Sequence, residues 1–228
     1  MIPTLSTKLP RITTEEMIEV DRLMIEEYGI LLMQMMENAG RCLAILARDR
    51  FLEGRVGGRH IAVLAGTGGN GGGALVAARR LRAWGAKVSV FLSKPEGMRE
   101  IPQHQLGIVQ RMGVPVSTAT ELPQDHEYDL ILDGIIGYSI QGNPRGNTKA
   151  LIEWANQQAT PTLSLDTPSG LDLTSGTIYS PTIAAAATLT LALPKHGLFA
   201  EGVAAVRGEL YLGDISVPPA LYAEPSLG

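Results

Sequence analysis

The sequence is short of cysteine, since Cys42 is the only one among 228 residues. A single cysteine cannot form a disulfide within the chain, and it cannot supply the several thiolates of a zinc cluster. Cys42 also falls within an apolar pattern at helical spacing, which predicts a core thiol. Because chains without disulfides are typical of reducing compartments, we expect a cytoplasmic protein.

Long apolar runs and a strong charge of either sign are missing as well. Residues 183–193 form the most apolar later stretch, but they are too few and too rich in threonine to span a bilayer. The first residues of the chain lack the apolar centre of a signal peptide. The formal net charge of −4 argues against nucleic acid or an anionic membrane as the main partner.

The chain does contain enough apolar sequence for a sizeable core. Hydrophobic residues make up 45% and charged residues 18% of it, which excludes a disordered protein. The length allows one large domain or two small ones. We interpret residues 1–228 as a single domain, because no linker, repeat or low-complexity segment divides them.

Glycine is concentrated in one stretch, Gly66-Thr-Gly-Gly-Asn-Gly-Gly-Gly73, which follows an apolar run and precedes apolar residues at helical spacing. This pattern predicts a strand, a tight loop and the start of a helix. Glycines let a ligand approach the N–H groups of the loop, and the positive end of the helix dipole attracts an anion. The candidate phosphate site comprises Gly69, Asn70, Gly71, Gly72 and Gly73.

Three interpretations of this loop compete. Gly66-x-Gly68-x-x-Gly71 matches the dinucleotide-binding fingerprint, but the next strand ends in Ser93-Lys94 where that fingerprint has an acid. A P-loop would carry lysine and a hydroxyl residue after its last glycine, and neither is present. A turn that binds nothing is the third alternative, although each helical glycine costs about 1 kcal/mol and a run of them needs a reason.

The rest of the chain alternates between strand and helix patterns. A capping box at Thr13-Thr-Glu-Glu16 begins one helix, a second is predicted at 31–51, and both precede the first strand. Further helices are predicted at 74–84, 102–112 and 148–156. Strands are predicted at 61–65, 87–92, 114–117, 130–133, 162–166, 188–193 and 208–215, with no helix between the last two. This alternation predicts an α/β fold with a mostly parallel sheet and helices on both faces.

Two predicted strands end in a carboxylate, at Asp133 and at Asp166. In a parallel sheet these ends lie at the same edge as the glycine loop, so the two side chains are candidates for general acid and base catalysis or for holding a cation. Oxygen atoms of Asn70 and Ser169 could join such a cation site, but spacing alone does not decide this. Asp residues that only accept hydrogen bonds from turn N–H groups are the alternative. Of the four histidines, only His196 follows a predicted strand end near this edge.

Several ordered motifs resemble one known family over nearly the whole chain. They are the glycine loop, Leu132-Asp133-Gly-Ile-Ile-Gly137, Leu165-Asp166-Thr-Pro-Ser169-Gly, Pro194-Lys195, Gly213-Asp-Ile215, Val20-Asp21-Arg22 and Met36-Glu-Asn-Ala-Gly40. Together they resemble the YjeF N-terminal domain family, the NAD(P)H-hydrate epimerases. The resemblance implies a Rossmann-like three-layer α/β/α sandwich, often dimeric. It also implies an isomerase of metabolite repair, which interconverts the R and S C6-hydrates of NADH and NADPH so that a separate dehydratase can restore the cofactor.

The resemblance also implies roles for individual residues. Asn70, Asp133 and Ser169 would hold a potassium ion, and residues 69–73 would bind phosphate. The hydrated dinucleotide would be contacted by Gly137, Tyr138, Ser139, Ile140, Gln141, Gly142, Asn143 and Asp166. The predicted catalytic residues are Asp166, as both acid and base, and Asp133, which together with the cation would hold the geometry.

Three positions depart from the family pattern: Gly69 replaces an Asn, Gly73 an Asp and Gln141 a Lys. These departures predict reduced activity, and they keep open the alternative of a nucleotide-binding module that has lost the chemistry. We expect that Gly73→Asp with Gly69→Asn would raise both binding and rate. An ordinary nicotinamide dehydrogenase is disfavoured, because the ribose-binding acid is missing. The expected partners are a dinucleotide ligand, a separate NAD(P)H-hydrate dehydratase and a second copy of the chain.

Overall fold

A computed structural model describes residues 2, 4–5, 9–94, 96–123, 127–138 and 140–223; the predicted contact residue Ser139 lies outside this part. Its described strands form one seven-stranded parallel sheet in the order β3-β2-β1-β4-β5-β6-β7. The strands are β1 His60–Ala65, β2 Lys87–Leu92, β3 Val116–Thr118, β4 Leu130–Gly134, β5 Thr162–Leu165, β6 Ala187–Leu191 and β7 Glu209–Gly213.

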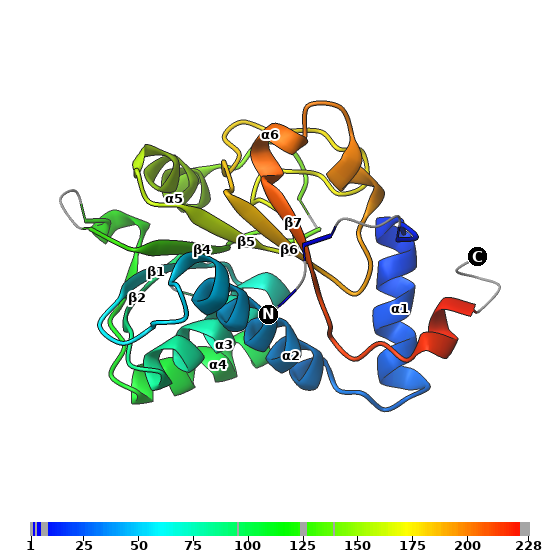
Figure 1. Cartoon of the computed structure of the whole chain (residues 1–228), viewed down its shortest axis with the longest axis horizontal. Helices are drawn as coiled ribbons and strands as arrows, with labels where there is room; N and C mark the ends of the chain where they lie inside the picture. The colour runs from blue at the N-terminus through cyan, green and yellow to red at the C-terminus, as the bar shows by residue number, and fades with distance from the viewer. Residues whose placement is uncertain are drawn as a thin grey trace.

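Helices cover both faces of this sheet, which confirms the predicted three-layer α/β/α fold (Figure 1). One face carries α2, α3 and α4, and the other carries α5. The α-helices are α1 Thr14–Glu26, α2 Leu32–Leu46, α3 Gly69–Ala83, α4 Glu100–Arg111, α5 Gly146–Gln157 and α6 Ala204–Arg207. The strand order reverses between β1 and β4, and ligands in such sheets bind beyond the carboxyl ends of the strands at that point.

The two faces are held by separate apolar clusters, and the alternation of β1 explains why. Val63 and Ala65 point to the cluster beneath α2 and α3, whereas Ala62 and Leu64 point to the cluster beneath α5. All four side chains are fully buried, as expected for a central parallel strand that has helices on both sides. The sheet therefore forms a rigid platform for the residues at its edge.

Helix α1 lies outside the regular alternation of strands and helices, as predicted for a helix that precedes β1. Its capping box forms as the sequence predicts, because the Thr13 hydroxyl accepts from Glu16 N–H and the Glu16 carboxylate accepts from Thr13 N–H. The helix stands beside the sheet next to the 3-10 helix η4 Pro219–Ala223 (Figure 1). Backbone hydrogen bonds of 3.1 Å join Ile12 to Pro194 and to His196, which ties the start of α1 to the segment after β6.

Three predicted segments differ from the structure. The helix predicted at 74–84 begins at Gly69, so residues 69–73 form the first turns of α3 rather than a loop. The helix predicted at 31–51 ends at Leu46 and continues as a π-helical turn, η1 Ala47–Phe51. Between β6 and β7, where no helix is predicted, the chain forms a 3-10 turn, η3 His196–Phe199, and the four-residue α6. Helices this short do not show a helical period in the sequence, so pattern analysis misses them. No helix in the described part of the chain is long and apolar enough to cross a membrane.

Candidate active site

A cavity of about 630 Å³ opens at the carboxyl edge of the sheet, next to the ends of β1, β4 and β5. Its polar wall is built by Asp21, Asn70, Tyr138, Asp166 and Lys195. Its apolar wall is built by side chains of α1, α2 and α4, namely Met17, Leu32, Met35, Met36, Ile101 and Pro102. A cavity of this volume, apolar with a few convergent polar groups, is typical of a small-molecule site.

The start of α3 contributes backbone to the cavity wall. Gly68, Gly69 and Asn70 line the cavity, and α3 begins at Gly69 without a side chain to cap it. The first N–H groups of an α-helix have no partner within the helix, and they carry the positive end of its dipole. The predicted anion site therefore has its backbone donors at the cavity.

The later glycines of the loop lie behind the cavity wall rather than in it. A Cβ on Gly71 would collide with the carbonyl of Gly66, and one on Gly72 would collide with the Sδ atom of Met36. A Cβ on Gly73 would lie 2.6 Å from Cδ2 of Leu165. These three glycines let α3 pack closely on its neighbours, and a direct contact between them and a ligand stays a prediction.

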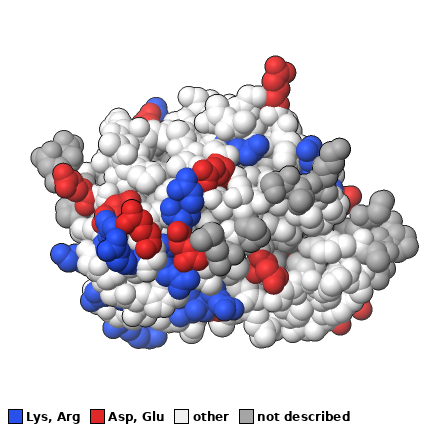
Figure 2. Space-filling model, in the orientation of Figure 1, with Lys and Arg blue, Asp and Glu red and all other residues white. Residues whose placement is uncertain are grey.

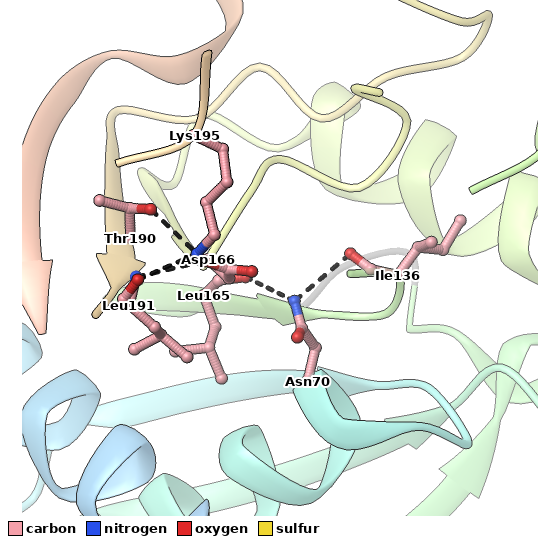
Figure 3. Close-up of polar contacts among 7 residues, drawn as sticks. All are labelled: Asn70, Ile136, Leu165, Asp166, Thr190, Leu191 and Lys195. Carbon is pink, nitrogen blue, oxygen red and sulfur yellow. Dashed lines mark hydrogen bonds and ion pairs between the residues drawn. The ribbon is translucent and has the colours of Figure 1, made fainter. Parts of the chain in front are cut away.

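Asn70 connects the start of α3 to the ends of two strands. Its Nδ2 atom donates to the carbonyl of Leu165 at 2.7 Å, and it also lies 3.5 Å from the carbonyl of Ile136 (Figure 3). The side chain thus lies at the point where the strand order reverses. Its hydrogen bonds fix the positions of the residues that end β5 and follow β4 relative to the start of α3.

Asp133 lies deeper, at the centre of a saturated hydrogen-bond network. The buried carboxylate accepts from Ser169 Oγ at 2.5 Å, Ser169 N at 2.9 Å, Ser164 Oγ at 2.8 Å and Ile135 N at 3.2 Å. Burial raises the pKa of Asp133, and these hydrogen bonds act against that rise. Asp133 does not line the cavity, so its geometry favours a role in holding the ends of β4 and β5 over direct contact with a ligand.

The residues around Asn70 carry oxygen atoms of the kind that bind a monovalent cation. The Asn70 Oδ1 atom, the Ile136 carbonyl, the Ser169 hydroxyl and the Asp133 carboxylate come from connected residues of one network. A Cβ on Gly137 would lie 2.7 Å from Asn70 Oδ1, so only glycine leaves that oxygen uncrowded. Mostly neutral oxygens with one carboxylate suit a singly charged ion better than a transition metal. The described residues contain no cluster of three or more His, Cys, Asp or Glu side chains that could hold a metal ion.

Asp166 forms a buried ion pair with Lys195. Asp166 was predicted as a site residue, whereas Lys195 was not. Lys195 Nζ donates to Asp166 Oδ1 at 2.6 Å and to the Leu191 carbonyl at 2.9 Å (Figure 3). Leu191 N and Thr190 Oγ1 donate to the same carboxylate oxygen at 3.2 and 3.4 Å. Asp166 has a positive φ of 65°, an uncommon backbone conformation for a residue other than glycine. Such strain is often found at functional positions.

The signal for Lys195 was a lysine directly after the Pro194 that ends an apolar strand. Lys195 is only 1% exposed, and a fully buried lysine needs a partner. His196, the histidine expected near this edge, is exposed and does not line the cavity. The functional group of this segment is therefore an ammonium rather than an imidazole.

Asp21 belongs to a motif of the family resemblance, but the sequence analysis gave it no role in the site. Asp21 lies one helical turn after Met17, on the side of α1 that faces the protein interior. A carboxylate is unexpected on the apolar side of a helix, and this position was the signal in the sequence that could have identified it. Burial raises the pKa of Asp21 to about 6; the charge of Lys195 lowers it and the charge of Asp166 raises it. Burial also raises the pKa of Tyr138, to which the charges of Asp21 and Asp166 add, while Arg99 acts in the opposite direction.

The predicted dinucleotide-binding segment after β4 only partly lines the cavity. Gly137 and Tyr138 belong to its wall. Outside this wall lie Ile140, Gln141, Gly142 and Asn143. The Asn143 side chain accepts instead from the backbone N–H of Ser180 at 3.1 Å. Contacts of these four residues with a ligand stay a prediction.

Comparisons with known proteins identify the family of this chain. The family model described as YjeF-related protein N-terminus matches residues 32–197. An NAD(P)H-hydrate epimerase of Dehalogenimonas lykanthroporepellens is 44% identical over 220 residues, which cover 95% of this chain and 86% of that protein. A bifunctional NAD(P)H-hydrate repair enzyme Nnr of Moorella thermoacetica is 37% identical over 93% of this chain, but the match covers only 41% of that longer protein. The crystal structure of the yeast protein YNL200c matches with a TM-score of 0.80 at 29% identity, over 94% of this chain and 93% of the yeast chain.

Proposed function

Because the chain belongs to the family of YjeF-related protein N-terminal domains, we propose that it is an NAD(P)H-hydrate epimerase. This isomerase interconverts the R and S hydrates at nicotinamide C6 of NADH and NADPH, and so serves repair of the damaged cofactor. The observation that carries the proposal is the cavity in which the free start of α3 and the carboxylate of Asp166 face the same space.

The two kinds of wall suit the two parts of the substrate. The N–H groups at the start of α3 are placed for the phosphates of the dinucleotide, since a helix N-terminus attracts anions. The apolar wall, with Met17 and Met36, offers a flexible surface for a planar ring. This arrangement brings the hydrated ring toward Asp166 at the polar wall.

The reaction needs proton transfer at an oxygen on C6. A proton passes to the C6 hydroxyl, the C6–O bond breaks with its electron pair leaving on water, and the ring nitrogen supplies an electron pair to C6. Water then adds from the other face and gives up a proton. Asp166 is our acid–base residue for these transfers, since no described residue hydrogen-bonds to its Oδ2 atom and this oxygen is available to the substrate.

Asp133, Ser169 and Asn70 act in this proposal as positioning residues. They hold the ends of β4 and β5 together, and they are our ligands for a potassium ion. When bound, potassium would supply a fixed positive charge beside the buried carboxylate of Asp133. Neutral oxygen donors and the glycine at 137 support this assignment.

The alternative of a binding module that has lost the chemistry receives less support from the site. Gly73, where the family carries an acid, faces Leu165 rather than the cavity, so the glycine removes no group from the cavity wall. Gly69 lies at the wall with open space around it. The acid–base residue Asp166 and the positioning residues Asp133 and Ser169 are all present.

Partners follow from the same proposal. A separate NAD(P)H-hydrate dehydratase would use the repaired epimer, as the bifunctional names of the longer relatives suggest for those proteins. A homodimer is supported by exposed apolar side chains on α1 and at the start of α2. They are Ile18, Ile25, Tyr28, Leu31 and Leu32. Most charged side chains seen in Figure 2 gather instead over the half of this face that α2, α3 and α4 occupy in Figure 1.

We treat residues 1–228 as one domain, because one sheet holds all the described strands. We place the protein in the cytoplasm, because its single cysteine cannot form a disulfide within the chain.

The deciding experiment is direct. The purified protein is added to one separated epimer of NADPH hydrate, and the approach to the equilibrium mixture is followed by chromatography. We expect a large acceleration over buffer, and a loss of most of it in Asp166→Asn. If the wild type binds NADP⁺ in a calorimeter but does not accelerate the interconversion, the binding module is the correct interpretation.

A further inference from the structure

Asp21 reaches the cavity from a helix that the rest of the site does not use. Val20 and Met24 of α1 are fully buried, and they fix the rotation of the helix against the body of the protein. That rotation turns Met17 and Asp21 toward the cavity, where both form part of the wall. The carboxylate of Asp21 is therefore held in place by the packing of its own helix.

The charged and titratable groups that face Asp21 come from four other segments. Asp166 and Lys195 follow β5 and β6, Tyr138 follows β4, and Tyr222 belongs to η4; the charge of Asp21 raises the pKa of both tyrosines. Among the described residues, none forms a hydrogen bond with the Asp21 carboxyl group, whereas Asp166 accepts from Lys195 and Leu191. Within the part of the chain that the structure describes, protein donors thus hold the carboxylate of Asp166 but not that of Asp21.

We propose that Asp21 is a second acid–base residue of this cavity, exchanging a proton with oxygen on one face of the nicotinamide ring while Asp166 does so on the other. The inference rests on the proposed epimerase function. Epimerisation removes an oxygen from one face of C6 and adds an oxygen to the opposite face. Asp21 comes from α1 and Asp166 from the loop after β5, so each face of C6 would have a carboxylate from its own segment of the cavity lining.

The two carboxyl groups account for every proton of the reaction. Protonated Asp21 gives its proton to the C6 hydroxyl, the C6–O bond breaks, and water departs as the electron pair of the ring nitrogen moves toward C6. Water on the other face then forms the new C6–O bond, the electron pair returns to nitrogen, and Asp166 accepts the released proton. The opposite epimer reacts by the same steps in reverse. Proton exchange with water then returns Asp21 to its protonated form and Asp166 to its ionised form.

The environment of Asp21 suits such a role. A pKa of about 6 leaves the group partly protonated near neutral pH, so it can both give and accept a proton. Two carboxyl groups with unequal surroundings in one cavity are the usual arrangement for an acid and a base.

The test compares Asp21→Asn with a control on the same helix, Glu26→Gln, which removes an exposed carboxylate paired with Arg22. We expect Asp21→Asn to lower kcat by about 10²-fold or more, the usual contribution of a proton-transfer group, while the Kd for NADP⁺ measured by calorimetry changes little. The limb of the wild-type pH profile near pH 6 should disappear. Asp21→Glu, which keeps a carboxyl group, should restore part of kcat, and Glu26→Gln should match the wild type.

The outcomes separate this inference from the proposed function. If the wild type is active and Asp21→Asn keeps both its kcat and the limb near pH 6, the epimerase assignment stands and the role of Asp21 is wrong. A loss of kcat that Asp21→Glu does not reverse, with the pH profile unchanged, would show a structural role and would also overturn the inference. An inactive wild type removes the proposed function and this inference together.

Discussion

Lys195 Nζ lies 2.6 Å from Asp166 Oδ1, and both side chains are buried where the segments after β5 and β6 meet. The lysine also donates to the carbonyl of Leu191, so it fastens the loop that carries Asp166 to the end of the neighbouring strand. A charged hydrogen bond of this kind orients the carboxylate, and all the donors to Asp166 among the described residues bond to Oδ1 rather than to Oδ2. The position of the proposed acid–base residue thus depends on a residue from a different segment.

Lys195→Met should remove this support and leave a buried carboxylate without its partner. Because breaking one side of a buried pair is costly, we expect the free energy of unfolding to fall by about 3–5 kcal/mol. We expect kcat for the epimerisation to fall about 10²-fold or more, since Asp166 loses its orientation. Urea unfolding and the chromatographic assay measure the two effects.

Lys149→Met is the matched control, because Lys149 pairs with Glu153 at 3.6 Å on the surface of α5. Exposed pairs contribute about 0–1 kcal/mol, so this variant should unfold and react like the wild type. If the two lysine variants have the same free energy of unfolding and the same kcat, the buried pair does not support the fold and the site as proposed.

The potassium assignment predicts a dependence on the identity of the monovalent cation. Replacing potassium with tetramethylammonium should lower the melting temperature of the wild type and weaken NADP⁺ binding, because a bound ion stabilises the folded state. Ser169→Ala removes a proposed ligand and a donor to Asp133, so its melting temperature should be lower and no longer respond to the cation. A wild type that is indifferent to the cation would refute the site.

The structure predicts different effects for Gly69→Asn and Gly73→Asp. The sequence alone predicts that the two substitutions together raise both binding and the epimerisation rate. Gly69→Asn should fold as well as the wild type, because open space surrounds a Cβ at 69. Gly73→Asp should lower the melting temperature and should not raise the rate, because its side chain would meet Leu165 and place a carboxylate among buried apolar groups. Calorimetry and the epimerisation assay on the two single variants decide the matter, and a faster Gly73→Asp protein would restore the original expectation.

Asp21 predicts that stability and pH are coupled through the proposed site. Folding raises its pKa from 3.8 to about 6, so between these values the folded protein binds more protons than the unfolded chain. The free energy of unfolding therefore contains a contribution from Asp21 that is present below pH 3.8 and is lost as the pH rises through 6. Asp21→Asn should melt at a higher temperature than the wild type at about pH 8, and the difference should shrink toward about pH 4. A wild type that melts at the higher temperature at both pH values would contradict the raised pKa.

The fold was predictable because the regular alternation of β1 through β5 with α3, α4 and α5 has a strong period. The glycine loop, Asp133 and Asp166 were found for the same reason, since parallel strands place their carboxyl ends at one edge. Lys195 and Asp21 were noted only as parts of family motifs and were not predicted as site residues. The first lies after a strand in a segment with no period of its own, and the second lies on a helix outside the alternation. The packing role of Gly73 depends on a contact with Leu165 that no local pattern records.

The hydrogen bonds that join Ile12 to Pro194 and His196 link segments that are far apart along the chain. Contacts of long sequence separation are formed late, because the entropy of closing a long loop is lost before they are gained. The sheet and its glycine loop can thus assemble from successive neighbours, whereas α1 docks only after the segment that carries Lys195 is in place. During synthesis on the ribosome, the cavity wall that holds Asp21 would close last, so a nascent chain would have a nucleotide-binding edge before it has a complete site.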